Sequence, residues 1–349
     1  AQLGSDARSA NSMAVGTLGV LFTLRGLASS LDGPAWTLWV NPLGWLQETR
    51  PASGDHWAPL LLALGLTTVV VGCAFGLQAR RDFGQGLVAL RPGPARGAVR
   101  TSWALVRRLN RASLASWAIA FVALGVVFGF FVTSITDLLA GDAAVQQILA
   151  AGAASPDELT GAFLRMILTL IGIIAAVVGV QVMLKVRAEE LADRVEPVLA
   201  TALSRTRYLT SHIVLAFAST GALVLVAGSI VAAFAAGADI GVAYADAFWQ
   251  AAATVPAVWT VVALAVAVVG ARPVASIAAW AGVVVAFVLT LLGPTFGLDD
   301  WVLAINPFWH VPDVGAADAG PGGLVLLSVV TLALLALGLG GFRRRDLAR

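Results

Sequence analysis

The stretch MILTLIGIIAAVVGVQVMLKV, residues 166–186, decides the fold class of this chain. It carries no charge before Lys185, and about 20 apolar helical residues suffice to cross a bilayer core about 30 Å thick. Seven further runs of this kind occupy residues 13–31, 57–77, 114–133, 213–236, 248–270, 273–293 and 324–342. Since 59% of the 349 residues are hydrophobic and only 12% are charged, where a soluble domain has about 25% charged residues, we predict an all-α polytopic membrane protein with about eight transmembrane helices.

Lys and Arg residues lie mostly at alternate loops between these runs. Nineteen of the 22 lie before the first run, after the last, or at the loops that follow the second, fourth and sixth runs. Short loops rich in Lys and Arg stay in the cytoplasm. This side is therefore predicted to be cytoplasmic, together with both ends of the chain. The pI of about 9.2 follows from this topology and does not indicate a nucleic-acid partner.

An internal repeat relates the beginning of the chain to its end. The matching pairs are ARSANSMA at 7–14 with ARPVASIA at 271–278, NPLGWLQE at 41–48 with NPFWHVPD at 306–313, and ARRD at 79–82 with RRRD at 343–346. Their offsets are 264, 265 and 264 residues, so the register holds to one residue. We therefore expect residues 1–82 to be the last two spans of a first six-span half, 83–112 a cytoplasmic linker, and 113–349 a complete second half. The rest of the first half would precede Ala1, so the N-terminus is expected to be truncated.

The linker contains a stretch with helical patterning, TSWALVRRLNRAS at residues 101–113. Trp103, Val106 and Leu109 recur at helical spacing among arginines. This pattern predicts an amphipathic helix in the plane of the lipid headgroups. A plain charged linker is the alternative.

The segment between the fourth and fifth runs, residues 187–212, is patterned as well. Acids precede bases along it, which we interpret as two short helices whose charges are placed as helix dipoles favour, the second starting near Pro197. Val198, Leu199 and Leu203 would form an apolar patch suited to docking on another protein. The alternative is an ordinary charged loop.

Part of this segment, EELADRVEPVLATALSR at residues 189–205, resembles the coupling segment of type-2 ABC exporter permeases, above all the two-halved permeases of the polyketide and multidrug antibiotic export group. NPLGWLQETRP at residues 41–51, followed by a span and ARRD, resembles the end of the first half in the same group. The resemblance covers nearly the whole chain, which looks like the C-terminal two-thirds of such a permease. The positions that match the coupling motif are Glu189, Glu190, Arg194, Glu196, Leu199, Thr201, Ser204 and Arg205.

The resemblance implies the permease of an ATP-driven exporter of hydrophobic compounds such as antibiotics. Its partners would be the lipid bilayer and two copies of a cytoplasmic ABC ATP-binding subunit, which would bind ATP and Mg and dock on the coupling segment. The chain has no P-loop of its own, because a P-loop needs a Lys in G-x-x-x-x-G-K-[ST] and the only lysine is Lys185, in MLKV. No catalytic, cofactor or metal site is expected, since the three histidines show no metal-binding spacing.

Arg25 is the one charged residue well inside a predicted span. An arginine at mid-span costs about 2.5–3.5 kcal/mol, so it would either line the substrate path or reach out to a headgroup. No Asp or Glu lies within any predicted span, and proton-coupled transporters generally need such a carboxylate. An ion-coupled secondary transporter is therefore a weaker alternative, as is a non-transporting membrane scaffold or assembly factor.

Aromatic residues mark the predicted outer loop, residues 294–323. Trp301, Phe308 and Trp309 could lie on short helices that gate the outer exit, although tryptophans are also common at membrane interfaces. Elsewhere, the glycine pairs Gly72–Gly76 and Gly125–Gly129 are spaced for helix packing.

Overall fold

The computed structural model describes residues 7–30, 36–50, 54, 56–79, 101–134, 156–238, 240–316 and 319–345. All regular secondary structure in these ranges is helical. The chain divides into two compact units, residues 1–98 and 99–349. The expected linker between residues 83 and 100 and the two extreme ends of the chain lie outside the described residues.

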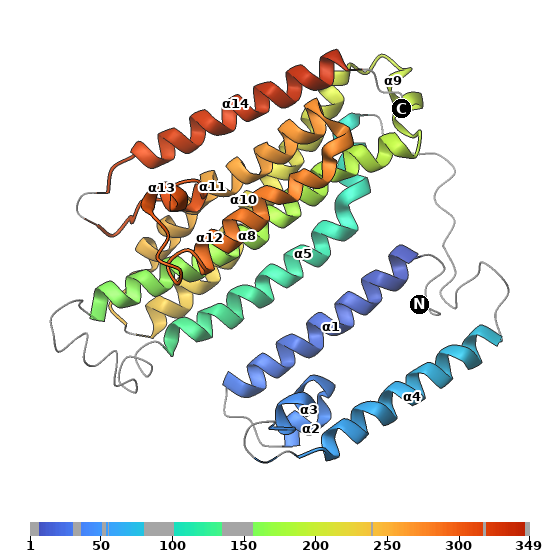
Figure 1. Ribbon diagram of the computed structural model, residues 1–349, viewed down its shortest axis with the longest axis vertical. Coiled ribbons are helices and arrows are strands. Elements are labelled where there is room, and N and C mark those ends of the chain that lie inside the picture. Colours follow the sequence, from blue (N-terminus) through green and yellow to red (C-terminus); the bar gives the residue numbers. More distant parts are fainter. Residues whose placement is uncertain are drawn as a thin grey trace. The chain divides into compact units, whose positions relative to one another are not determined.

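The first unit consists of two long helices joined by two short ones. They are α1 (Ala7–Ser30), α2 (Trp36–Val40), α3 (Pro42–Glu48) and α4 (Ala58–Ala79), as labelled in Figure 1. Helix α4 is long and apolar enough to cross a membrane, whereas the apolar stretch of α1, Met13–Gly26, is shorter than 18 residues. We call residues 36–50, which contain α2 and α3, the first hairpin.

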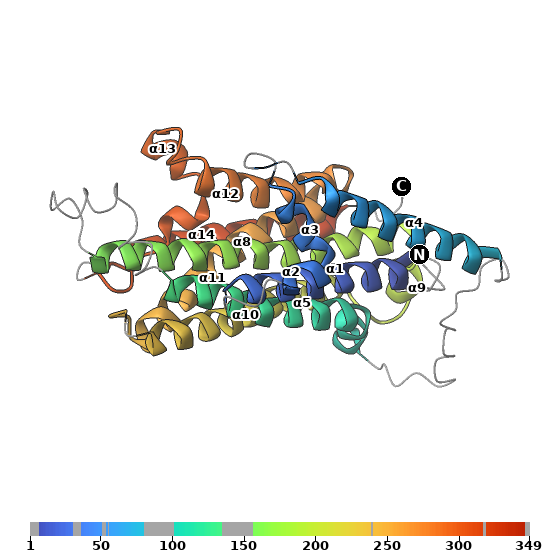
Figure 2. The same ribbon diagram turned by 90° about the horizontal axis from the view of Figure 1, so that it is seen from below.

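The second unit is a bundle of six long elements that run along one another (Figures 1 and 2). They are α5 (Ser102–Thr133), α8 (Pro156–Leu191), α10 (Arg205–Gly237), α11 (Tyr244–Ala271), the pair η1 (Pro273–Trp280) and α12 (Ala281–Leu291), and α14 (Gly322–Arg344). Three short helices complete it: α9 (Val195–Leu199) at one end of the bundle, and α13 (Asp300–Leu303) and η2 (Pro307–His310) at the other. We call residues 300–316, which contain α13 and η2, the second hairpin.

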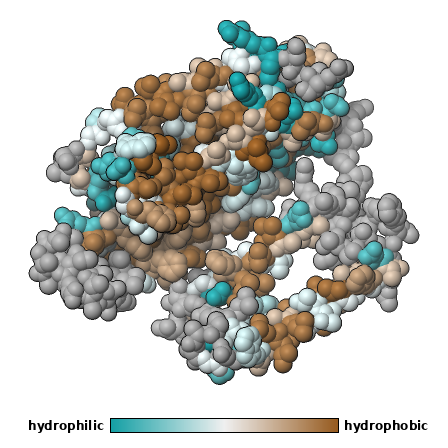
Figure 3. All heavy atoms as spheres, in the orientation of Figure 1, coloured by the Kyte–Doolittle hydropathy of each residue, from teal (hydrophilic) through white to brown (hydrophobic). Residues whose placement is uncertain are grey.

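Seven helices in the described ranges are long and apolar enough to cross a membrane, namely α4 and the six long elements of the second unit. The expected class, an all-α polytopic membrane protein, is thereby confirmed. Figure 3 shows that apolar side chains cover the surface along the helices of the second unit. Polar side chains gather at the end of the bundle where α14 ends near α9.

Several helices are longer than a bilayer core requires. Helix α8, with 36 residues, is about 54 Å long, and α5, with 32 residues, is about 48 Å long. Helix α5 starts where the side chain of Thr101 accepts a hydrogen bond from the N–H of Ala104 at 3.2 Å, and it continues to Thr133. The amphipathic stretch expected as a separate helix is thus the first part of α5, because no glycine or proline interrupts the chain before Gly125.

Close backbone contacts hold the bundle together. A Cβ atom added to Gly129 of α5 would lie 2.5 Å from the ring of Phe234 in α10, so the expected packing role of the Gly125–Gly129 pair is confirmed. A Cβ added to Gly270 of α11 would lie 2.2 Å from the carbonyl oxygen of Gly338 in α14. The other predicted pair, Gly72–Gly76 of α4, has no neighbour within 4 Å among the residues that the structure describes.

Candidate functional site

The coupling segment, residues 187–212, combines the last turn of α8, the helix α9 and the first turns of α10. Glu189 and Glu190 therefore lie at the C-terminal end of a long helix, and Arg205 lies at the N-terminal end of another. Helix dipoles disfavour both placements. The dipole argument drawn from the sequence is wrong for these residues, and ion pairs hold their charges instead.

Helix α8 ends in a Schellman motif centred on Asp193, whose φ of 54° lies in the left-handed region that Asp tolerates better than most residues. The N–H of Asp193 donates to the carbonyl of Glu190 and the N–H of Arg194 donates to the carbonyl of Glu189, each at 3.0 Å. The side chains of Glu189 and Arg194 form an ion pair at 3.5 Å across the same turn. The four named residues of the motif E-E-x-x-D-R thus end α8 and direct the chain into α9.

The carboxylate of Glu190 lies inside the second unit, with its side chain 1% exposed. It contacts Nη2 of Arg345 at 2.5 Å and Nη1 of Arg187 at 3.3 Å. The backbone carbonyl of Arg345 in turn accepts a hydrogen bond from Nη1 of Arg205 at 2.8 Å. We call these four residues the latch. Because it joins the ends of α8, α10 and α14, the Glu190 carboxylate is not available to another protein in this structure.

Helix α9 turns its apolar residues inwards. Val195 is buried, and Val198, Leu199 and Leu203 are partly buried against the core of the unit. The apolar patch expected to face a partner therefore packs within this chain. The surface that remains is the polar side of α9 and the turn after it, where Glu196 is exposed.

Two further residues of the predicted motif shape the turn between α9 and α10. The hydroxyl of exposed Thr201 donates to the carbonyl of Val198 at 2.7 Å. The side chain of Ser204 accepts a hydrogen bond from the N–H of Arg207 at 3.3 Å and so caps the start of α10. Their positions keep α9 at a fixed distance from the two spans that flank it.

At the opposite end of the bundle, Asn306 lies within the second hairpin as the N-cap of η2. Its Oδ1 accepts a hydrogen bond from the N–H of Phe308 at 3.1 Å, and its Nδ2 donates to the hydroxyl of Thr290 in α12 at 2.8 Å. Of the three aromatic residues expected to form a gate, only Phe308 is buried, at 6% exposure, and its ring lies 2.7 Å from where a Cβ of Gly172 would be. Trp301 and Trp309 are 70% and 50% exposed.

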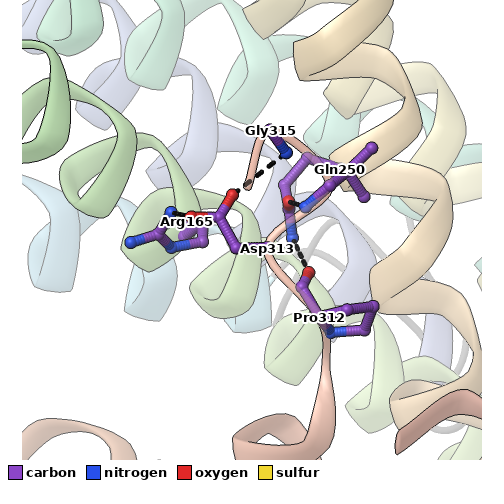
Figure 4. Close-up of polar contacts among 6 residues, drawn as sticks. Arg165, Gln250, Pro312, Asp313 and Gly315 are labelled. Atoms are coloured by element: carbon purple, nitrogen blue, oxygen red, sulfur yellow. Dashed lines mark hydrogen bonds and ion pairs between the residues drawn. The ribbon is translucent and has the colours of Figure 1, made fainter. Parts of the chain in front are cut away.

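A polar cluster holds the loop that follows η2, as Figure 4 shows. Arg165 of α8 forms an ion pair with Asp313, whose second carboxylate oxygen accepts from the N–H of Gly315 at 3.2 Å. The buried amide of Gln250 in α11 donates to the carbonyl of Pro312 at 3.0 Å and accepts from the N–H of Val314 at 2.9 Å. We call Arg165, Gln250 and Asp313 the clamp. It fixes the second hairpin to α8 and α11.

The clamp escaped sequence analysis because its partners are far apart in the chain. Arg165 and Asp313 are 148 residues apart, and Gln250 is 62 residues from Pro312. One signal was present: Gln250 is a polar residue in an otherwise apolar run, and a buried amide must find hydrogen-bond partners.

Arg25 lies near the end of α1 and is partly buried. The helix continues only five residues further, to Ser30, and its apolar stretch ends at Gly26. Arg25 therefore lies nearer the end of α1 than its start. Its expected contribution to a substrate path stays a prediction.

The bundle of helices able to cross a membrane, with a short helix between two long spans at one end and a clamped hairpin at the other, defines a polytopic membrane protein. Among the described residues, no three His, Cys, Asp or Glu side chains are grouped so that they could hold a metal ion.

Comparison with known proteins agrees with this class. Residues 99–343 match the family described as "Multidrug efflux system permease Rv1217c, C-terminal domain", and the chain belongs to this family. The chain is also 37% identical over 352 residues to the multidrug efflux system permease protein Rv1217c of Mycobacterium tuberculosis (strain ATCC 25618 / H37Rv). That alignment covers 99% of this chain and 63% of the relative, so the chain spans less than two thirds of the relative's length. The resemblance to multidrug export permeases is thereby confirmed.

Proposed function

We propose that this chain is the membrane-spanning part of an ATP-driven exporter of hydrophobic compounds such as antibiotics. The observation that carries the proposal is the match of residues 99–343 to a family of multidrug efflux permeases. ATP and Mg would be bound by two copies of a separate cytoplasmic ATP-binding subunit. The coupling segment would lie on the cytoplasmic side of a bacterial plasma membrane.

The shape of the coupling segment supports docking at α9. This helix lies at the end of the bundle, between α8 and α10, with Glu196 on its exposed side. Helices α8 and α10 are about 54 and 50 Å long, from 36 and 33 residues, and they pack on each other along the bundle. A force applied at α9 would therefore act directly on two long, well-buried spans.

In the proposed mechanism, the clamp would help to keep the outer end of the substrate path closed. Alternating access requires one end of the substrate path to close while the other is open. In the proposed mechanism, export would require the second hairpin to leave α8 and α11, and the clamp opposes that movement.

The test is to purify the complete permease together with a candidate ABC ATP-binding subunit and measure capture of the subunit, and to measure export of ethidium from cells that contain both. Glu196→Lys should weaken capture by at least about tenfold, because a desolvated charge at a contact is worth about 2–5 kcal/mol. The matched control is Asp300→Lys, the same charge reversal at an exposed acid of the second hairpin, which should leave capture unchanged. Unchanged capture with Glu196→Lys would exclude α9 as the docking site.

A second measurement separates ATP-driven export from ion-coupled transport. Ethidium export should stop when ATP is depleted while the ion gradients are clamped. Export that persists under those conditions, and stops when the gradients are collapsed, would favour a secondary transporter. A scaffold or assembly factor would show no export in either case.

A further inference from the structure

We infer that Arg345 is a positioning residue for coupling: it ties the end of α14 to the end of α8, so that α14 moves together with α9. The inference rests on the proposed function, in which α9 receives the force from the ATP-binding subunit. It adds the last residue of the described chain to a coupling element that the sequence motif places only at residues 189–205.

The first observation is the burial of the latch. The side chains of Glu190 and Arg345 are 1% and 12% exposed, and Arg345 also lies with its guanidinium carbon 4.8 Å from the centre of the Phe342 ring. A buried carboxylate is stable only when it is paired, and removal of Arg345 would leave Glu190 with Arg187 as its remaining cationic partner in a poorly solvated place. The end of α14 therefore cannot leave the end of α8 without exposing Glu190 to water or to another cation.

The second observation is that residues of α10 also contact the end of α14. Phe342 is fully buried and its ring stacks on that of Tyr208 in α10, with centroids 6.4 Å apart. Arg205, at the start of α10, donates to the carbonyl of Arg345. Both spans that flank α9 are thus bound to the same few residues of α14.

The third observation is the contact of α14 with α11. Beyond the close approach of Gly270 to Gly338, a Cβ on Gly341 would lie 2.6 Å from the Cα of Ala271. The hydroxyls of Thr260 and Thr331 also form a hydrogen bond at 2.9 Å between the two helices. The backbones of α11 and α14 are therefore in close contact along these positions, so a movement of one helix would be transmitted to the other.

These contacts form a continuous path through the second unit. It runs from α9 through the latch to α14, then to α11, and through Gln250 to the second hairpin. A path of contacts becomes a coupling mechanism only when its disruption changes the coupling. Arg345 is the place to disrupt it, because the neighbouring Arg343 and Arg344 are exposed and supply matched controls.

The test uses the complete transporter with its ATP-binding subunit in proteoliposomes and compares Arg345→Gln with Arg344→Gln. Capture of the subunit and stimulation of ATP hydrolysis by ethidium are measured for both. Arg345→Gln should leave capture within about twofold but reduce stimulation by about tenfold, since coupling between sites is worth about 5- to 150-fold. Arg344→Gln should change neither quantity.

The variant Glu190→Gln and the double variant, Glu190→Gln with Arg345→Gln, complete a double-mutant cycle. If Glu190 and Arg345 act as one unit, the double variant should lose no more stimulation than either single variant, whereas independent effects would multiply. Arg345→Lys keeps the charge without the planar fork and should retain part of the stimulation. It also serves as the readout if Arg345→Gln does not reach the membrane.

Three results would overturn the inference. They are equal effects of Arg345→Gln and Arg344→Gln, multiplying effects in the double variant, and loss of capture in step with loss of stimulation. The last would assign Glu190 to docking itself. A different result, no capture of an ATP-binding subunit by the unsubstituted chain, would reject the proposed function and not the latch alone.

Discussion

The two hairpins share hydrogen bonds at equivalent positions, although α3 is an α-helix of 7 residues and η2 is a 3₁₀-helix of 4. In the first hairpin Oδ1 of Asn41 accepts from the N–H of Leu43 at 3.0 Å, as Oδ1 of Asn306 does from Phe308 in the second. Each pair of equivalent residues is 265 positions apart, the offset found in the sequence. The predicted repeat therefore extends from sequence to individual bonds.

A second pair of bonds matches although the residue types differ. The indole Nε1 of Trp45 donates to the carbonyl of Trp39 at 2.7 Å, and Nε2 of His310 lies 2.8 Å from the carbonyl of Ala304, again 265 residues further on. A carbonyl can only accept, so Nε2 of His310 carries the proton. At this position of the hairpin a ring nitrogen thus lies against the equivalent backbone carbonyl in both copies, from an indole in one and an imidazole in the other.

The hairpins differ in how they are anchored. Nδ2 of Asn306 donates to Thr290, 16 residues earlier, whereas Nδ2 of Asn41 donates to the carbonyl of Leu21, 20 residues earlier and thus one helical turn further away. Counted with the 265-residue offset of the hairpins, the position equivalent to Thr290 is Arg25, whose guanidinium has no acceptor. The hydrogen bonds within the hairpin are therefore the same in both copies. The bond that anchors the hairpin differs, because it depends on which acceptor the preceding helix provides for the asparagine Nδ2.

The largest expected difference between the hairpins lies in Phe308 and its equivalent, Leu43. Phe308→Ala should lower the free energy of unfolding by about 3–5 kcal/mol, because it leaves a cavity beside Gly172. Leu43 is only partly buried, so Leu43→Ala should cost less than half as much. Chemical unfolding in detergent micelles, followed by tryptophan fluorescence, measures both. Equal losses would mean that Phe308 anchors nothing beyond its own hairpin.

The asparagines should respond alike. Asn41→Ala and Asn306→Ala each remove a bond within the hairpin and a bond to the preceding helix, so each should cost about 1–3 kcal/mol in the same measurement. A cost confined to one of them would break the equivalence on which the repeat rests.

The charged anchors should differ modestly. Asp313, paired with Arg165 of α8, corresponds to Glu48, which pairs at 3.6 Å with its neighbour Arg50. Both pairs are partly exposed, so Asp313→Asn and Glu48→Gln should cost about 0.2–1 kcal/mol, with the larger loss for Asp313. The loss should shrink when salt is raised from about 0.1 M to about 1 M. A loss of unfolding free energy that does not depend on the salt concentration would be assigned to the hydrogen bond between Asp313 and Gly315 instead.

The smallest effect is expected from Arg25→Thr, which gives Asn41 the kind of acceptor that Asn306 already has. The free energy of unfolding should change by about 0.5 kcal/mol or less. The informative quantity is the coupling between this substitution and Asn41→Ala in a double-mutant cycle. Additive effects would show that Asn41 keeps its bond to Leu21 and that the helix register, not Arg25, sets the anchor.

These contrasts also show how far the sequence reaches. The spans, the repeat and its register follow from hydropathy and from short matching motifs, because those signals are local or exactly periodic. The latch does not, since Glu190 and Arg345 are 155 residues apart and Arg345 is one of three consecutive arginines that look alike in sequence. The dipole argument failed for a related reason: it needs the end of α8, and only the left-handed conformation of Asp193 shows where that end lies.

The repeat also holds one segment in two conformations. Residues 273–280 form the 3₁₀-helix η1, which is kinked at Ala275, whereas their equivalents in the first unit, residues 9–16, lie within the α-helix α1. A 3₁₀-helix rises about 2.0 Å per residue with 3.0 residues per turn, against about 1.5 Å and 3.6 in an α-helix. Rewinding these eight residues would shorten the span by about 4 Å and rotate one end against the other by about 160°. The two copies of this span therefore differ in the winding of one segment, and with it in length and in the rotation of one end against the other.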